Sequence, residues 1–117
     1  MDAARVVVWH NPRCSNSRAV LQLLRDRGVE PDVVDYLAEP PDRAALLRVA
    51  GESGLGLRGL VREKDPAYAE QGLADADDEA LLAAMLDNPR LINRPVVVTP
   101  RGTRLCRPPE TVLTLLD

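Results

Sequence analysis

Residues 5–37, RVVVWHNPRCSNSRAVLQLLRDRGVEPDVVDYL, decide the fold. The segment opens at residues 5–9 with a β-branched apolar run of the kind that forms a buried strand. A polar break follows, and a helix is predicted that ends at Gly28. The candidates for the N-cap of this helix are Ser15, Asn16 and Ser17. A second strand is predicted at residues 33–37, so the order strand, helix, strand indicates a right-handed crossover with parallel pairing.

The rest of the chain predicts an inserted helical region, then a β-hairpin and a last helix. The insertion covers about residues 42–90, where apolar residues recur at helical spacing. Strands are predicted at residues 95–99 and 103–106, and a helix begins at Pro108. This order, β-α-β, helical insertion, β-β-α, is that of the thioredoxin fold. We therefore expect a single α/β domain over residues 1–117 with a mixed four-stranded sheet.

Composition narrows the class of protein. The 117 residues are 45% apolar, which suits one globular core. A net charge of -3 argues against a nucleic-acid binder, which needs a surplus of Lys and Arg. The first residues show no signal-peptide pattern, and no apolar run approaches the roughly 20 residues that cross a bilayer. The two cysteines are too few for a disulfide framework, so we expect a cytoplasmic protein with free thiols and no membrane partner.

Cys14 is the candidate reactive group, because it falls between the first predicted strand and the first predicted helix. Ligand sites of α/β sheets lie beyond the carboxyl ends of the strands, and a helix N-terminus favours an anion there. Such a position lowers a thiol pKa to roughly 3.5–7.5. Arg13, Arg18 and His10 can each add positive charge or a hydrogen bond. Ser17 lies one helical turn further on, within reach of the sulfur.

The residues alone support a reactive thiol and no more, since a lone cysteine is commonly a small buried hydrophobe. The loop has no second cysteine at position 17, so it cannot form a local disulfide. It has no Cys-x5-Arg phosphatase loop either, because residue 20 is Val. A monothiol forms a mixed disulfide or a covalent adduct that another thiol resolves. Cys106 is expected to pack in or beside the core, with a resolving role as the alternative. We find no cluster of His and Cys at metal-ligand spacing, so no metal is predicted.

The loop at residues 10–18, HNPRCSNSR, resembles the active-site loop of the glutaredoxin-coupled arsenate reductases, the ArsC family. The resemblance spans essentially the whole chain in order and is densest at residues 91–100, LINRPVVVTP, and 102–108, GTRLCRP. It implies a role for eight residues. These are Cys14 as nucleophile, His10 and Ser17 as residues that tune the thiolate, Arg62, Arg94 and Arg107 as oxyanion-binding residues, and Asn11 and the cis-proline Pro95 as structural residues of the site.

The resemblance also implies an activity. The Cys14 thiolate would attack arsenate, and glutathione and glutaredoxin would resolve the thiol-arsenate adduct and release arsenite. Three arginines suit such a site, because the planar guanidinium makes charge-assisted, often bidentate hydrogen bonds to tetrahedral oxyanions. No bound cofactor is expected, and glutathione is the co-substrate. Two alternatives remain: a glutathione-dependent thiol reductase of the same fold, and a Spx-like redox regulator that binds RNA polymerase.

Overall fold

The computed structural model describes residues 5–116, which form two compact units. The first unit combines the chain up to Glu39 with the chain from Arg94, and the second is Pro40–Asn93. Residues 1–4, on which the predicted lack of a signal peptide partly rests, lie outside the described residues. None of the helices within residues 5–116 is long and apolar enough to cross a membrane.

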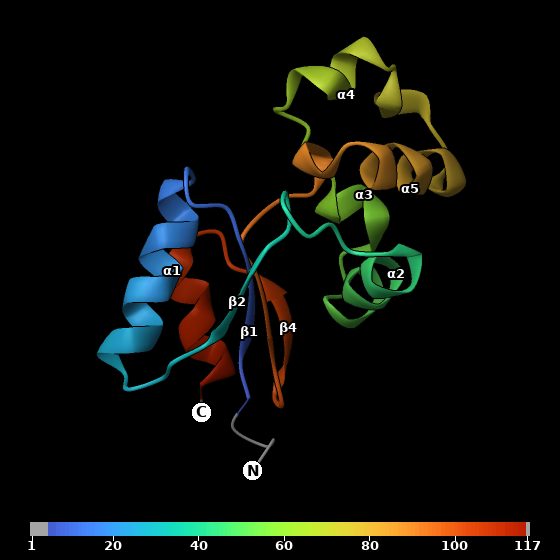
Figure 1. The fold of residues 1–117 in the computed structure, drawn as a ribbon. Helices are drawn as coiled ribbons and strands as arrows, with labels where there is room; N and C mark the ends of the chain where they lie inside the picture. Colours follow the sequence, from blue (N-terminus) through green and yellow to red (C-terminus); the bar gives the residue numbers. More distant parts are fainter. Residues whose placement is uncertain (1–4, 117) are drawn as a thin grey trace. The chain divides into compact units, whose positions relative to one another are not determined.

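The first unit is built on a mixed four-stranded sheet with the strand order β2-β1-β3-β4 (Figure 1). Its strands are β1 (Val7–His10), β2 (Asp32–Asp35), β3 (Val96–Thr99) and β4 (Gly102–Leu105). Strand β1 pairs in parallel with β2, and β3 pairs antiparallel with both β1 and β4. The predicted mixed sheet and parallel β-α-β unit are confirmed.

Two helices of this unit lie side by side against the sheet (Figure 1). They are α1 (Ser15–Asp26) and the C-terminal η4 (Pro109–Leu115), which is a 3-10 helix. Their apolar faces close the core on one side of the strands. The buried members of this core are Val6, Val8, Val20, Leu21, Leu24, Val97, Cys106, Val112 and Leu115. The core therefore fixes α1, and the loop before it, against the carboxyl end of β1.

The second strand is shorter than predicted. It ends at Asp35, and Tyr36 and Leu37 lie in a turn, so the strand predicted over residues 33–37 was wrong at its end. The Asp35 carboxylate accepts hydrogen bonds from the backbone N–H groups of Leu37 at 3.1 Å and Ala38 at 3.3 Å. An Asp that binds the following backbone in this way competes with strand pairing and starts a turn. The turn places Tyr36 in the interior, with 0% of its surface exposed.

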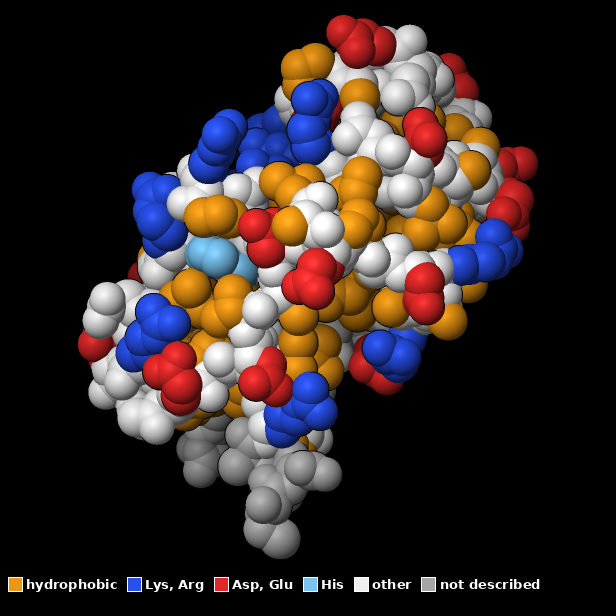
Figure 2. Space-filling view, viewed as in Figure 1, with side chains coloured by type: hydrophobic (Ala, Val, Ile, Leu, Met, Phe, Trp, Pro, Cys, Tyr) orange, Lys and Arg blue, Asp and Glu red, His pale blue; other side chains and the backbone are white. Residues whose placement is uncertain are grey.

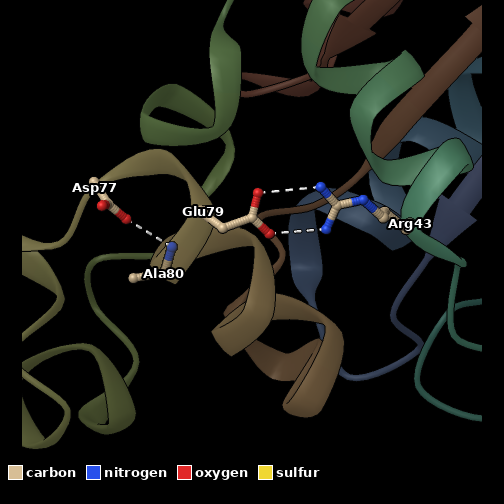
Figure 3. Close-up of polar contacts among 4 residues, drawn as sticks. All are labelled: Arg43, Asp77, Glu79 and Ala80. Carbon is tan, nitrogen blue, oxygen red and sulfur yellow. Dashed lines mark hydrogen bonds and ion pairs between the residues drawn. The ribbon is translucent and has the colours of Figure 1, made fainter.

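The second unit consists of short helices with no sheet strand of its own among the described residues. They are α2 (Arg43–Glu52), α3 (Gly56–Leu60), α4 (Pro66–Glu70), η2 (Leu73–Asp75), α5 (Asp78–Asp87) and η3 (Pro89–Leu91). Aspartates cap three of them, and Figure 3 shows one, Asp77, accepting from the N–H of Ala80 at 2.9 Å. The same figure shows the exposed pair in which Arg43 binds both carboxylate oxygens of Glu79.

Arg58 organises the irregular part of this unit. Its half-buried guanidinium donates to the Tyr68 hydroxyl at 3.1 Å and to the carbonyl of Leu73 at 2.9 Å. It also donates to the carbonyl of Ala76. One cation thus satisfies three oxygens in a stretch where the chain has few regular backbone hydrogen bonds.

Candidate functional site around Cys14

Cys14 itself is the N-cap of α1, in an extended conformation with φ -92° and ψ 123°. The prediction that Ser15, Asn16 or Ser17 caps this helix was therefore wrong. The backbone N–H of Cys14 donates to the carbonyl of Asn11 at 3.0 Å, and this tight turn starts the helix immediately after the cysteine. The Cys14 side chain makes no standard capping hydrogen bond, but it occupies the position where N-cap side chains face the free N–H groups.

This position favours the thiolate form of Cys14. Burial alone would raise the pKa of the thiol. It is outweighed by hydrogen bonding from the Ser17 N–H, the Arg94 guanidinium, the Asn16 N–H and the Ser17 hydroxyl, in that order. Together they lower the pKa of Cys14 from 9.0 to about 7. A half-buried thiol of this pKa is about half ionised at neutral pH, which makes it a nucleophile.

Asn11 ties the loop around the cysteine together. Its backbone N–H donates to the hydroxyl of Ser17, a fully buried residue, at 3.3 Å. Its side-chain oxygen accepts from the N–H of Arg13 at 2.9 Å, and its side-chain nitrogen donates to the Tyr36 hydroxyl at 3.5 Å. With the carbonyl that accepts from Cys14, all the polar groups of this buried residue are used to hold the loop.

Two of the three predicted arginines reach this loop within the first unit. Arg107 places a guanidinium nitrogen 3.9 Å from the sulfur of Cys14, and the same nitrogen donates to the carbonyl of Arg94 at 3.0 Å. With the Asn16 amide oriented so that both of its polar atoms are satisfied, its oxygen accepts from both terminal nitrogens of Arg107 at 3.2 Å. Hydrogen bonding from the Arg94 guanidinium is the second-largest of the effects that lower the pKa of Cys14. The thiol is thus flanked by two cations suited to an oxyanion.

Both arginines precede a proline in a cis peptide bond. The Arg94–Pro95 bond is cis, as the sequence resemblance implied for Pro95. The Arg107–Pro108 bond is also cis, which the sequence did not predict. The carbonyl of Pro95 accepts from the N–H of Cys106 at 2.9 Å, so the two proline segments lie side by side next to the Cys14 loop.

The model of the ArsC family matches residues 9–115. The chain belongs to the ArsC family. It is 52% identical over 113 residues to a protein of Rhizobium meliloti (strain 1021) named arsenate reductase, covering 95% of this chain and 81% of that one. It is 47% identical over 117 residues to "Uncharacterized protein YfgD" of Escherichia coli (strain K12), covering 96% and 97%. A solved structure described as an arsenate reductase from Vibrio cholerae superposes with a TM-score of 0.91 at 43% identity, covering 95% and 97%.

His10 lies at the carboxyl end of β1 in this ArsC-family chain, beside Asp35 of β2. It is 8% exposed, and in Figure 2 hydrophobic side chains largely border the pale blue area of the only histidine. Burial lowers the pKa of His10, Asp35 opposes this, and the charges of Arg25 and Arg18 lower it further. His10 is therefore largely neutral at pH 7 and does not supply the positive charge that its position in the sequence suggested.

Arg62, the third predicted oxyanion-binding residue of the family, lies in the second unit, two residues after the end of α3. Its backbone N–H donates to the carbonyl of Leu91 at 2.7 Å, beside the short bridge between Val61 and Ile92. Its side chain is half-buried. Because Cys14 belongs to the first unit, the oxyanion-binding role of Arg62 stays a prediction.

Cys106 packs in the core of the first unit, with none of its surface exposed. Burial raises the pKa of its thiol to about 12, against a small opposing effect of Arg104. A thiol that is neither exposed nor ionised does not attack a disulfide or an adduct. The prediction that Cys106 packs in the core is confirmed, and the alternative resolving role has no support.

Sequence reasoning missed Tyr36 as a site residue. Its hydroxyl accepts from Asn11, and both Arg94 and Cys14 influence its pKa. The available indication was its place at the carboxyl end of the second parallel strand, the edge at which the Cys14 loop also lies. Within residues 5–116, no group of three or more His, Cys, Asp or Glu residues is placed to hold a metal ion.

Proposed function

We propose that this protein is an arsenate reductase in which Cys14 is the nucleophile. The observation that carries the proposal is a thiol that lies 3.9 Å from the Arg107 guanidinium and whose pKa is lowered to about 7, in part by Arg94 of the same unit. The relatives named arsenate reductase support the choice of oxyanion. The thiolate attacks the arsenic, and two guanidinium groups offset the negative charge of the oxygens, which would otherwise repel it.

The reaction balances with two thiols as the reductant. The sulfur of Cys14 bonds to arsenic(V), and one arsenate oxygen takes up protons and leaves as water. The sulfur of glutathione then bonds to the sulfur of Cys14, and the bond between sulfur and arsenic breaks with both electrons left on arsenic. Arsenic is thereby reduced to the trivalent state and leaves as arsenite, while Cys14 and glutathione are oxidised to a mixed disulfide. Glutaredoxin removes the glutathione by thiol–disulfide exchange and regenerates the Cys14 thiol.

Glutathione and glutaredoxin are part of the proposal because the Cys14 loop has a single thiol. Ser17 stands where a dithiol enzyme has its second cysteine, and its hydroxyl cannot form a disulfide. Cys106 is buried and un-ionised in the described structure. An external thiol therefore has to resolve the adduct. In this proposal Arg94 and Arg107 bind the oxyanion.

The test is arsenate-dependent oxidation of NADPH through glutathione reductase, glutathione and glutaredoxin. Activity should vanish in Cys14→Ser and fall by about 100-fold in kcat/KM in Arg94→Ala, as for loss of one oxyanion-stabilising donor. Arg101→Ala is the matched control, because Arg101 is exposed in the hairpin turn. A folded protein with a reactive Cys14 and no arsenate turnover would refute the proposal. Turnover of a glutathione mixed disulfide would then indicate a thiol reductase, and a stable complex with RNA polymerase would indicate a regulator.

A further inference from the structure

Tyr36 is a fully buried tyrosine that brings one polar group, its hydroxyl, to the Cys14 loop. The ring is buried in the turn that directly follows the carboxyl end of β2. A buried hydroxyl is retained at little cost only when it has hydrogen-bond partners. What those partners are therefore indicates what the hydroxyl is for.

The partners of the hydroxyl belong to the site. The side-chain nitrogen of Asn11 donates to the Tyr36 oxygen at 3.5 Å. Burial raises the pKa of Tyr36, while hydrogen bonding from Asn11 and the charge and hydrogen bonding of Arg94 lower it, and the charge of Cys14 raises it. The hydroxyl oxygen thus contacts the residue that ties the loop together, and Arg94 acts on the pKa of both the hydroxyl and the Cys14 thiol.

We propose that Tyr36 is a positioning residue, whose hydroxyl oxygen accepts from Asn11 and Arg94 and so holds the Cys14 loop and the Arg94 guanidinium in their working geometry. The part of this inference that concerns oxyanion binding rests on the proposed function. The part that concerns ionisation of the Cys14 thiol does not. Asn11 carries the chain of contacts to the thiol, because its carbonyl accepts from the N–H of Cys14 and its own N–H donates to Ser17. Arg94 is the second connection, because it acts on both the Tyr36 hydroxyl and the Cys14 thiol.

The Tyr36 hydroxyl is a neutral hydrogen-bond acceptor, and a neutral group suits a position near both Arg94 and the Cys14 thiolate. The charged groups that act on the hydroxyl are Arg94 and the Cys14 thiolate. A carboxylate in place of Tyr36 would orient Arg94 equally well, but it would neutralise the guanidinium and repel both the thiolate and an incoming oxyanion. The net rise in the pKa of Tyr36 keeps the hydroxyl neutral at physiological pH. Arg94 therefore keeps its full charge for the substrate.

The first test is Tyr36→Phe, which keeps the ring and removes the hydroxyl. The midpoint of Cys14 alkylation by iodoacetamide should rise by about half a unit of pH, because Arg94 and the loop no longer favour the thiolate. The KM for arsenate should rise about 3- to 10-fold with a smaller change in kcat, since Arg94 is no longer held for oxyanion binding. Tyr68→Phe is the control, because it removes the chain's other tyrosine hydroxyl, a partner of Arg58 in the second unit. An unchanged or lowered alkylation midpoint in folded Tyr36→Phe overturns the proposal.

A second measurement keeps the hydroxyl and does not depend on the stability of Tyr36→Phe. In Tyr68→Phe protein grown with 3-fluorotyrosine, the single fluorine resonance reports on Tyr36. It should shift with a midpoint near pH 7, that of the thiol, and this shift should be absent in Cys14→Ser. Lack of a thiol-dependent shift overturns the proposal. Alkylation and fluorine spectra need no arsenate, so failure of arsenate turnover in the unaltered protein leaves the Tyr36 result readable.

Discussion

Replacing Ser17 by alanine removes two contacts of one buried hydroxyl. The hydroxyl hydrogen-bonds the Cys14 thiolate, and its oxygen accepts from the backbone N–H of Asn11 at 3.3 Å. The Ser17 backbone N–H, which acts more strongly on the thiolate, is unaffected by the substitution. Ser17→Ala therefore tests one side-chain contribution to thiol ionisation with α1 left in place.

The size of the effect follows from the pKa of Cys14. Hydrogen bonding from four groups lowers it from 9.0 to about 7 in spite of burial. The Ser17 hydroxyl is the smallest of these four effects, and because burial opposes them their sum exceeds the net change, so about half a unit of pKa is assigned to the hydroxyl. Ser17→Ala should therefore raise the midpoint to about 7.5, so that the thiolate fraction at pH 7 falls from about one half to about one quarter. The unpaired N–H of Asn11 should cost about 1 kcal/mol of unfolding free energy, the low end of the range because the bond is long.

The assay is the rate of Cys14 alkylation by iodoacetamide between pH 5 and 10, with urea unfolding measured alongside. At pH 7 the rate should fall about twofold, and above pH 9.5 it should equal that of the unaltered protein, since both thiols are then ionised. Ser15→Ala is the control, because Ser15 is exposed at the start of the same helix and does not contribute to the pKa of Cys14. An alkylation midpoint for Ser17→Ala that matches the Ser15→Ala midpoint would refute the reasoning about the hydroxyl.

Three further outcomes are expected. Because the folded pKa of Cys14, about 7, lies below the ordinary 9.0, its ionisation stabilises the fold fully above pH 9 and that stability is lost as the pH falls through 7. Urea unfolding should show a gain of about 1 kcal/mol between pH 6 and 9, after allowance for solvent screening, which Cys14→Ser lacks. Iodoacetamide at pH 8 should label Cys14 alone in the native protein and Cys106 only in urea, as mass spectrometry of the peptides would show. Arg58→Ala should cost about 2 kcal/mol by urea unfolding, because its carbonyl partners lose a charged donor, whereas Arg43→Ala in an exposed pair should leave the midpoint unchanged.

The order of the elements along the chain and the parallel β-α-β unit could be predicted because they follow from local patterns. Apolar β-branched runs, a helical repeat and a turn between two strands are all visible in the chain. The end of β2 could not be predicted, because Tyr36 continues the strand pattern. The backbone turns there because the Asp35 side chain accepts hydrogen bonds from the residues that follow. The same turn buries the tyrosine. An error of two residues in a boundary therefore concealed a member of the site.

Some features of the site could likewise be predicted from the sequence, and others could not. The place of Cys14 between strand and helix, and the part of its lowered pKa that comes from Asn16 and Ser17, follow from topology and the helix N-terminus. The nearness of Arg107 to the sulfur could not be read from spacing, since 93 residues separate them, and it entered only through the family resemblance. His10 shows the opposite case. Its position suggested a cation, but its burial, which depends on the tertiary fold, makes it neutral.

The opposing effects on Cys14 set a pKa that suits a nucleophile better than a much lower one would. A thiol loses intrinsic nucleophilicity as its pKa falls, so the fastest attacking thiol has a pKa near the ambient pH. Hydrogen bonds from the helix start and from Arg94 lower the pKa of Cys14, and burial raises it. The resulting pKa is about 7. Arg94 and Arg107 are themselves half-buried, so less water competes for their guanidinium groups. Burial thus reduces ionisation of the thiol but strengthens the attraction of the arginines for the oxyanion, which accounts for a reactive cysteine that is only half exposed.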